Sequence, residues 1–355
     1  MQVLGSKASR HQERRCDLVF EGGGVKGIGL AGAFSVLEER GYTPQNLAGS
    51  SAGAITAALV AAGYRSDELR KLVLDLDFRQ FQDKGWEDKV PLIGKALSLL
   101  RDQGIYEGRR LCEWLDSMLE PKGVRTFADL RTEWDDPRWS FKLQVTVSDL
   151  TSRRLLVLPR DAHLLGLDPL TLKVSDAVRM SMSIPVFFEP VRLMNPQTNR
   201  EHLLVDGGIL SNFPVWLFDS VGEEPDWPTF GLMLVEPEPK PLEDGMPVRG
   251  PRGLRGLRSL VLGLTQTLLE AHDRLYLERA QFARTITIPT QGVGTTEFNL
   301  ERERAMKLYE SGRAGAEQFL ASWDFDAYLK EFRGDKPHNR RESVREELAA
   351  VRVSA

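Results

Sequence analysis

Short apolar runs alternate with helical patterns in the first part of the chain. Cys16–Phe20 is a mostly apolar run typical of a buried strand, and helical spacing of apolar residues covers about Ile28–Arg40. A strand end at Leu47–Gly49 and a second helical segment at Ala54–Val60 follow. Because a strand, a turn and a helix occur twice in succession, the pattern predicts a parallel α/β sheet.

Further apolar runs predict more strands and one long helix. A helical period spans Leu257–Arg284. Between Glu236 and Gly256, five prolines and four glycines fall in 21 residues, which predicts a loop or mobile flap. Strands are expected at Lys142–Val147, Leu155–Leu158, His202–Val205, Phe230–Val235 and Thr285–Ile288.

Composition and charge narrow the class of protein. The 355 residues are 41% hydrophobic and carry a net charge of -4, which argues against a nucleic-acid partner. The two cysteines, Cys16 and Cys112, are far apart, so a reducing compartment and a cytoplasmic location are expected. The N-terminus has basic residues but no apolar core of a signal peptide. The most apolar stretch, Leu47–Gly63, is too short and too interrupted to span a membrane.

The first candidate for chemistry is the sequence Gly49-Ser50-Ser51-Ala52-Gly53, which has the form G-x-S-x-G. A nucleophilic serine needs a sharp turn between a strand and a helix, and the crowding at this turn requires glycine two residues on either side. Ser51 is therefore the candidate nucleophile, and Ser50 is a packed neighbour. A purely structural Gly/Ser turn is the alternative.

Three consecutive glycines, Gly22, Gly23 and Gly24, precede the first helix. Backbone N–H groups in such a loop bind anions, so a phosphate cradle and an oxyanion hole both fit. No G-K-[ST] follows at P-loop spacing, and the loop lacks the G-x-G-x-x-G pattern of dinucleotide sites. An oxyanion hole explains the glycines and the downstream serine together.

The third candidate is Asp206-Gly207-Gly208, which follows an apolar strand. An isolated Asp-Gly pair is typical of a plain turn, but a nucleophilic serine also needs a base within hydrogen-bond reach. Histidine is the usual base, yet no histidine lies in a glycine-rich or otherwise marked loop. The five histidines are His11, His163, His202, His272 and His338.

Taken in order, these motifs resemble those of the patatin-like phospholipase family. The resemblance is carried by Phe20–Gly27, Gly49–Gly53 and Asp206–Gly208, and it is strong from about Leu18 to Asn212. Val147–Leu150, Ala177–Phe188 and Ser211–Pro214 are similar to the family's remaining segments, and Leu308–Leu320 matches weakly. The family often has aspartate where Glu21 stands and arginine where Lys26 stands.

The resemblance implies a three-layer α/β sandwich with a mostly parallel central sheet flanked by helices. It also implies a catalytic dyad in which Ser51 attacks an acyl ester, Asp206 accepts the proton, and Gly22, Gly23 and Gly24 receive the oxyanion. The expected substrates are phospholipids or lysophospholipids, and the chemistry requires no cofactor and no metal. We expect a basic tail at residues 1–16, a catalytic domain at 17–325 that includes the loop at 236–256, and a charged tail or peripheral helix at 326–355.

One surface feature concerns lipid. Arg249, Arg252, Arg255 and Arg258 recur every three residues and lead into the apolar helical face that begins at Leu257. A basic flank joined to an amphipathic helix is how a peripheral enzyme contacts an anionic membrane. The alternative is a solvated linker followed by a core helix.

Two other functions fit parts of the pattern. An α/β-hydrolase esterase shares G-x-S-x-G, but it uses a histidine, for which His272 and His338 are the candidates late in the chain. An acyltransferase-like or lipid-binding relative without hydrolytic activity is the second alternative, and Asp206 argues against it because such transferases usually pair serine with histidine.

Overall fold

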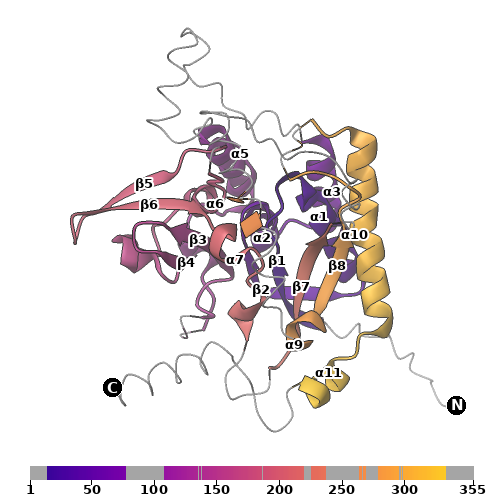
Figure 1. The fold of residues 1–355 in the computed structure, drawn as a ribbon. Coiled ribbons are helices and arrows are strands. Elements are labelled where there is room, and N and C mark those ends of the chain that lie inside the picture. The colour runs from indigo at the N-terminus through magenta and orange to yellow at the C-terminus, as the bar shows by residue number, and fades with distance from the viewer. Residues whose placement is uncertain are drawn as a thin grey trace, which may run out of the picture.

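The computed structural model describes residues 14–76, 108–134, 136, 138–185, 187–219, 225–236, 264–265, 267–268, 279–295, 297 and 299–332. Within these residues a mixed sheet of eight strands runs through the centre of the molecule (Figure 1). The strands are β1 (Arg14–Phe20), β2 (Tyr42–Gly49), β3 (Leu143–Asp149), β4 (Arg154–Leu158), β5 (Val191–Asn195), β6 (Arg200–Asp206), β7 (Thr229–Val235) and β8 (Thr285–Pro289).

The sheet is mostly parallel, with its antiparallel strands at one end. The parallel pairs are β1 with β2, β1 with β7, β2 with β3 and β7 with β8. Strands β4 and β6 run antiparallel to β3, and β5 runs antiparallel to β6, on the left of Figure 1. Parallel neighbours require crossover connections, and the helices supply them.

Helices follow the strands in the order that such crossovers need. Helix α1 packs against α10, and α2 packs against β1, β2 and β3. The α-helices of the described residues are α1 (Gly27–Glu39), α2 (Ala52–Ala61), α3 (Ser66–Asp75), α5 (Arg109–Leu119), α6 (Val174–Ser181), α7 (Gly208–Ser211), α9 (Arg279–Phe282), α10 (Arg302–Ser322) and α11 (Phe325–Phe332).

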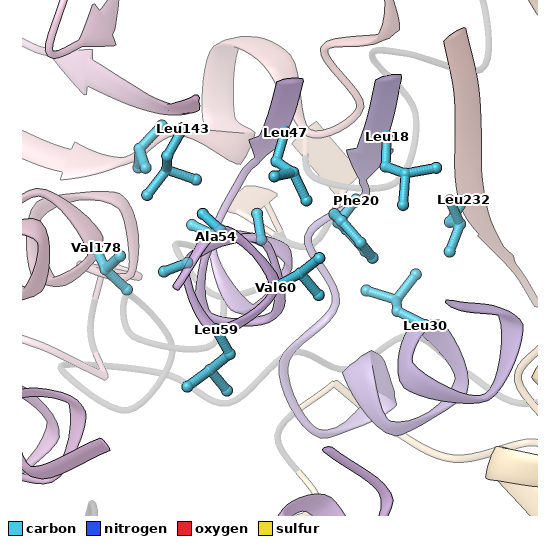
Figure 2. Packing of buried hydrophobic residues seen from close by; sticks show 14 of the residues in the cluster. Leu18, Phe20, Leu30, Leu47, Ala54, Leu59, Val60, Leu143, Val178 and Leu232 are labelled. Carbon is cyan, nitrogen blue, oxygen red and sulfur yellow. The ribbon is translucent and has the colours of Figure 1, made fainter. Parts of the chain in front are cut away.

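The main core lies between the sheet and these helices, and α2 is at its centre (Figure 2). Leu18 and Phe20 of β1 point into this core, whereas Val19 points to the opposite face, as the two-residue period of a strand requires. A second, smaller cluster covers that opposite face. Because α2 is buried on nearly all sides, the loop that precedes it has a rigid support.

The structure confirms the predicted fold class and all five later strands, with ends that differ by one or two residues. Helices α3 and α5 were not predicted, and neither were two features of the strands. Strand β2 already begins at Tyr42, because the polar segment before Leu47 pairs with β1. Strand β5 is a short edge strand, and its five residues include a charged arginine and a polar asparagine, so it has no apolar run. Strand β1 begins at Arg14, inside the segment expected to be a tail.

Some predictions fall outside the described residues. The proline- and glycine-rich loop is described only at Glu236, and the C-terminal segment only as far as residue 332, where α11 ends. Within the predicted helix at 257–284, Leu264 and Leu268 are exposed, so these two leucines are not core residues. Among the helices of the described residues, none combines the length and apolar character needed to cross a membrane.

Candidate active site

Ser51 occupies a strained turn between β2 and α2. Its backbone has φ 51° and ψ -128°, in the positive-φ region that side chains rarely adopt. The turn is crowded on both sides, because a Cβ atom at Gly49 would lie 2.5 Å from the Gly53 carbonyl oxygen. A Cβ at Gly53 would overlap the carbonyl oxygen of Phe20. Neither flanking glycine therefore has room for a side chain.

Strand register brings Asp206 to the same place. Val145 of β3 pairs with Leu158 of β4 and also with Gly49 at the end of β2. Val147 pairs with β4 and also with Asp206 at the end of β6. Because a strand has only two edges, β2 and β6 share the edge of β3 opposite β4, and they run toward each other along it. Their ends are separated by two residues of β3, or about 7 Å.

The Asp206 carboxyl is fully buried, and one of its oxygens has no partner. Oδ1 accepts a hydrogen bond of 2.8 Å from the Gly208 N–H, whereas Oδ2 has no hydrogen-bond partner among the described residues. Burial raises the pKa of Asp206 to about 7, and the Ser51 hydroxyl and the Gly208 N–H act in the opposite direction. Ser51 thus lies beside the carboxylate without a hydrogen bond of ordinary geometry to Oδ2.

The glycine loop presents two unpaired N–H groups. Gly22 donates its N–H to the Asn212 carbonyl over 3.0 Å, so it cannot supply an oxyanion donor in this conformation, which corrects the prediction for Gly22. No described residue accepts a hydrogen bond from the N–H of Gly23 or Gly24. Gly24 has φ 57°, and a Cβ there would overlap the carbonyl oxygen of Thr295. These two glycines remain the candidate donors.

Two buried charged side chains, Glu21 and Lys26, hold this loop, and the sequence indicated no partner for either. Lys26 forms an ion pair of 2.5 Å with Glu236, and the Thr290 hydroxyl also donates to Glu236, over 2.8 Å. Glu21 accepts the backbone N–H of Leu234. No local sequence pattern signals either contact, because the partners lie more than 200 positions away.

Serines at the end of α6 connect the nucleophile to the base. The Ser181 hydroxyl accepts the Ser51 N–H over 2.9 Å, and the Ser181 carbonyl accepts the Gly207 N–H over 3.2 Å. The Ser183 carbonyl accepts the Asp206 N–H over 3.0 Å. Ser50 is the packed neighbour that the sequence predicted, since its hydroxyl accepts a hydrogen bond of 2.8 Å from Thr146.

The histidines of the described residues lie elsewhere. His202 is buried and its Nδ1 lies 2.7 Å from Asp149 Oδ2. It is four residues before Asp206 on the same strand, or about 13 Å along it, so it is not placed to act on Ser51. His163 is exposed and bonds the Arg160 carbonyl. His11, His272 and His338 lie outside the described residues.

The remaining predicted site residues are the glycines after Asp206 and the four arginines. Gly207 has no room for a side chain, because a Cβ would overlap the Thr146 carbonyl oxygen, and Gly208 supplies the N–H that holds Asp206. The four arginines from Arg249 to Arg258 lie outside the described residues. Within the described part of the chain, no group of three or more His, Cys, Asp or Glu side chains is arranged to hold a metal ion.

A strained serine beside a buried carboxylate, at the carboxyl edge of a mostly parallel sheet, defines a candidate serine hydrolase. A model of the patatin-like phospholipase family matches residues 18–219, which is more than half of the chain. The chain therefore belongs to the patatin-like phospholipase family. Membership of this family indicates a lipid acyl hydrolase with a lipid substrate.

Individual relatives agree with this assignment. The chain is 36% identical over 309 residues to the uncharacterized protein YqhO of Bacillus subtilis, covering 87% of this chain and 99% of that protein. It is 26% identical over 220 residues to triacylglycerol lipase 4 of Saccharomyces cerevisiae, covering 58% of this chain and 23% of the yeast protein. The crystal structure of VipD from Legionella pneumophila has the same fold, with a TM-score of 0.51 at 20% identity, covering 87% of this chain and 67% of VipD.

Proposed function

We propose that this protein hydrolyses the carboxylic ester bonds of phospholipids or lysophospholipids through a Ser51–Asp206 dyad and an acyl-enzyme intermediate. The observation that carries the proposal is Oδ2 of the fully buried Asp206, which has no hydrogen-bond partner in the described part of the chain and lies beside a serine held in a strained turn. A buried acceptor without a partner is rare in proteins. An oxygen that must accept a proton during the reaction accounts for it.

In the first half of the reaction, Ser51 Oγ attacks the carbonyl carbon of the ester while Asp206 Oδ2 takes the hydroxyl proton. The carbonyl oxygen becomes an oxyanion, which the N–H groups of Gly23 and Gly24 stabilise. The tetrahedral intermediate then collapses, the bond to the alcohol breaks, and Asp206 returns the proton to the departing alkoxide. The acyl group remains on Ser51.

In the second half, water replaces the alcohol. Asp206 takes one proton from the water, whose oxygen attacks the acyl carbon, and collapse releases the fatty acid as Ser51 recovers its proton. A pKa of about 7 suits both halves, because the same group must act as base and then as acid near neutral pH.

The substrate class follows from the family and is refined by experiment. The full chain is incubated with vesicles of phosphatidylcholine, with lysophosphatidylcholine and with triacylglycerol, and the released fatty acid and alcohol are identified by mass spectrometry. We expect release from the two phospholipids by the parent chain and none by Ser51→Ala. Release from triacylglycerol alone would replace the proposed substrate with a neutral lipid, while equal release by Ser51→Ala would overturn the dyad.

Contact with a membrane surface and a cytoplasmic location belong to this proposal as well. A vesicle substrate requires the enzyme to approach a lipid surface, and the arginines from Arg249 to Arg258 are the residues that the sequence puts forward for that contact.

A further inference from the structure

Asn212 is a buried side chain that the dyad mechanism does not use. It lies directly after α7 and is 5% exposed. Its side-chain Nδ2 donates a hydrogen bond to the Gly22 carbonyl over 2.9 Å, and the backbone carbonyl of Asn212 accepts the Gly22 N–H over 3.0 Å. Both polar groups of the Gly22 backbone are therefore held by this one residue.

The fit between these residues is tight. A Cβ atom at Gly22 would overlap the side-chain oxygen of Asn212 and lie 3.0 Å from the Ser51 Cβ. Asn212 and Ser51 thus both pack against Gly22, so a displacement of the amide moves the start of the glycine loop relative to the nucleophile.

The amide is held in one orientation. Its Nδ2 lies between two acceptors, the Gly22 carbonyl and, at 3.5 Å, Oε1 of Glu21. Glu21 also accepts the Leu234 N–H of the neighbouring strand. A carboxylate in place of the amide would face both acceptors with negative charge and no donor.

The same segment also carries the base. Asp206 is six residues before Asn212, and the N–H of Gly208, the first residue of α7, holds its Oδ1 at 2.8 Å. One short rigid piece of chain therefore fixes the base at one end and the glycine loop at the other.

Resting on the function proposed above, we propose that Asn212 is a positioning residue for the oxyanion hole. By occupying both backbone groups of Gly22, which packs against Ser51, it leaves the N–H groups of Gly23 and Gly24, which have no acceptor among the described residues, as the donors of this loop. Its contribution is made in the transition state, where the oxyanion exists, and not in binding of the intact ester.

Asn195 offers a matched control. It is also a buried asparagine, 2% exposed, whose side chain holds a loop: Nδ2 donates to the Leu164 carbonyl over 3.2 Å and Oδ1 accepts the Gln197 N–H over 2.9 Å. It lies on the edge strand β5, and none of its side-chain hydrogen-bond partners in the described part of the chain is a proposed catalytic residue. Loss of either amide removes comparable buried hydrogen bonds, but only one of them adjoins the glycine loop.

The test compares Asn212→Ala and Asn195→Ala with the parent chain. Three readouts are compared. The first is kcat and KM on a short-chain soluble ester, and the second is the thermal unfolding midpoint. The third is the inhibition constants of two inhibitors: a trifluoromethyl ketone, which forms an oxyanion with the serine, and an ether analogue, which does not react. Asn212→Ala should lower kcat and ketone affinity by about tenfold to a hundredfold, with KM and ether affinity within about threefold. Asn195→Ala should lower only the unfolding midpoint.

A second variant keeps the inference testable if the alanine variant does not fold. Asn212→Asp has nearly the same shape and should lower kcat at least as much. A loss of stability with unchanged kcat and an unchanged ratio of ketone to ether affinity, in either variant, would make Asn212 a purely structural residue. Ser51→Ala separates the two proposals: full activity of that variant overturns the dyad itself, whereas an inactive Ser51→Ala with a fully active Asn212 variant overturns only the inference about Asn212.

Discussion

Two buried aspartates at different levels of the sheet have the same raised pKa and different surroundings. Burial raises the pKa of both Asp206 and Asp17 to about 7. Asp17 is the middle residue of β1, where its Oδ1 accepts hydrogen bonds from the Asn46 backbone, the Asn46 amide and the Trp227 indole. Asp206 accepts one bond on Oδ1 and none from the described residues on Oδ2.

The difference shows what marks a catalytic carboxylate. Arg284, itself buried and paired with Asp219, also lowers the pKa of Asp17, so hydrogen bonds and a nearby positive charge offset part of the effect of burial at Asp17. The Asp206 side chain adjoins a strained serine and keeps one oxygen unpartnered. A raised pKa alone therefore does not distinguish the two aspartates, and the oxygen without a partner among the described residues is the reason why Asp206 is the proposed base.

The largest effect should come from the dyad. Ser51→Ala and Asp206→Asn should each lower kcat by about 10²-fold to 10⁴-fold or more, because each removes a group that takes part in proton transfer. Asp17→Asn is the matched control and should keep kcat per folded molecule within about threefold. Steady-state rates on a soluble ester, with circular dichroism as the check on folding, measure both.

The histidines should not be needed for catalysis. Replacing all five histidines should leave at least about a tenth of the parental rate. Loss of activity from a single histidine substitution would show that the dyad model is wrong.

The next largest effect concerns the glycine loop. Gly24→Ala should lower kcat by about 10²-fold to 10³-fold, because its positive φ and the Thr295 carbonyl leave no place for a methyl group. Gly23→Ala should lower kcat by only about tenfold, because the added methyl group would meet the end of the Leu234 side chain, which can move aside. Equal rates for Gly24→Ala and the parent would make the loop a structural turn.

A pH profile tests whether Asp206 acts as the base. Asp206 acts as a base only when ionised, so kcat/KM should fall about tenfold per pH unit below about 7 and level off above it. Its folded pKa lies above the unfolded value, so the stability from this group is fully present near pH 4 and is lost as the pH rises through 7. Asp206→Asn should therefore raise the unfolding midpoint at pH 8 and not at pH 4. A flat rate profile from pH 5 to 9 is the contrary result.

A smaller effect is expected from the serine that joins nucleophile and base. Ser181→Ala removes the acceptor of the Ser51 N–H and should lower kcat about tenfold without moving the pH midpoint. Ser175→Ala is a control on the same helix, because the Ser175 hydroxyl is buried with no partner among the described residues. Similar rates for both variants would show that Ser181 only packs.

The smallest effect on catalysis should come from the arginines at 249, 252, 255 and 258. Changing all four to glutamine should spare hydrolysis of a soluble ester while weakening binding to anionic vesicles, since each basic residue contributes about 1 kcal/mol near such a surface. Binding by the parent should also fall with added salt. Vesicle sedimentation measures both, and equal binding by parent and mutant would leave the arginines as a solvated linker.

The sequence was sufficient to predict the parts of the site that are local. The elbow at Ser51 and the loop at Gly24 are turns whose backbone conformation or close packing requires glycine, and glycine is visible in a sequence. The strand before Asp206 could also be predicted locally, because Leu203, Leu204 and Val205 form an unbroken apolar run.

What the sequence left open depends on contacts between distant segments. The occupied N–H of Gly22, the role of Ser181 and the buried pair of Lys26 with Glu236 are set by partners that no local pattern identifies. The position of Asp206 is of this kind too: its Asp-Gly-Gly motif is visible in the sequence, but its distance from the serine is not. Only the register of β2, β3 and β6 brings it next to Ser51.

The central claim is that Ser51 is activated by Asp206 without a histidine, and covalent labelling tests it most directly. The parent, Asp206→Asn and Asp17→Asn are reacted with a fluorophosphonate, and the adduct is located by peptide mass spectrometry while the labelling rate is followed. The account predicts a single adduct on Ser51, formed at least about a hundredfold more slowly in Asp206→Asn and at the parental rate in Asp17→Asn. An adduct on another residue, or an unchanged labelling rate in Asp206→Asn, would contradict it.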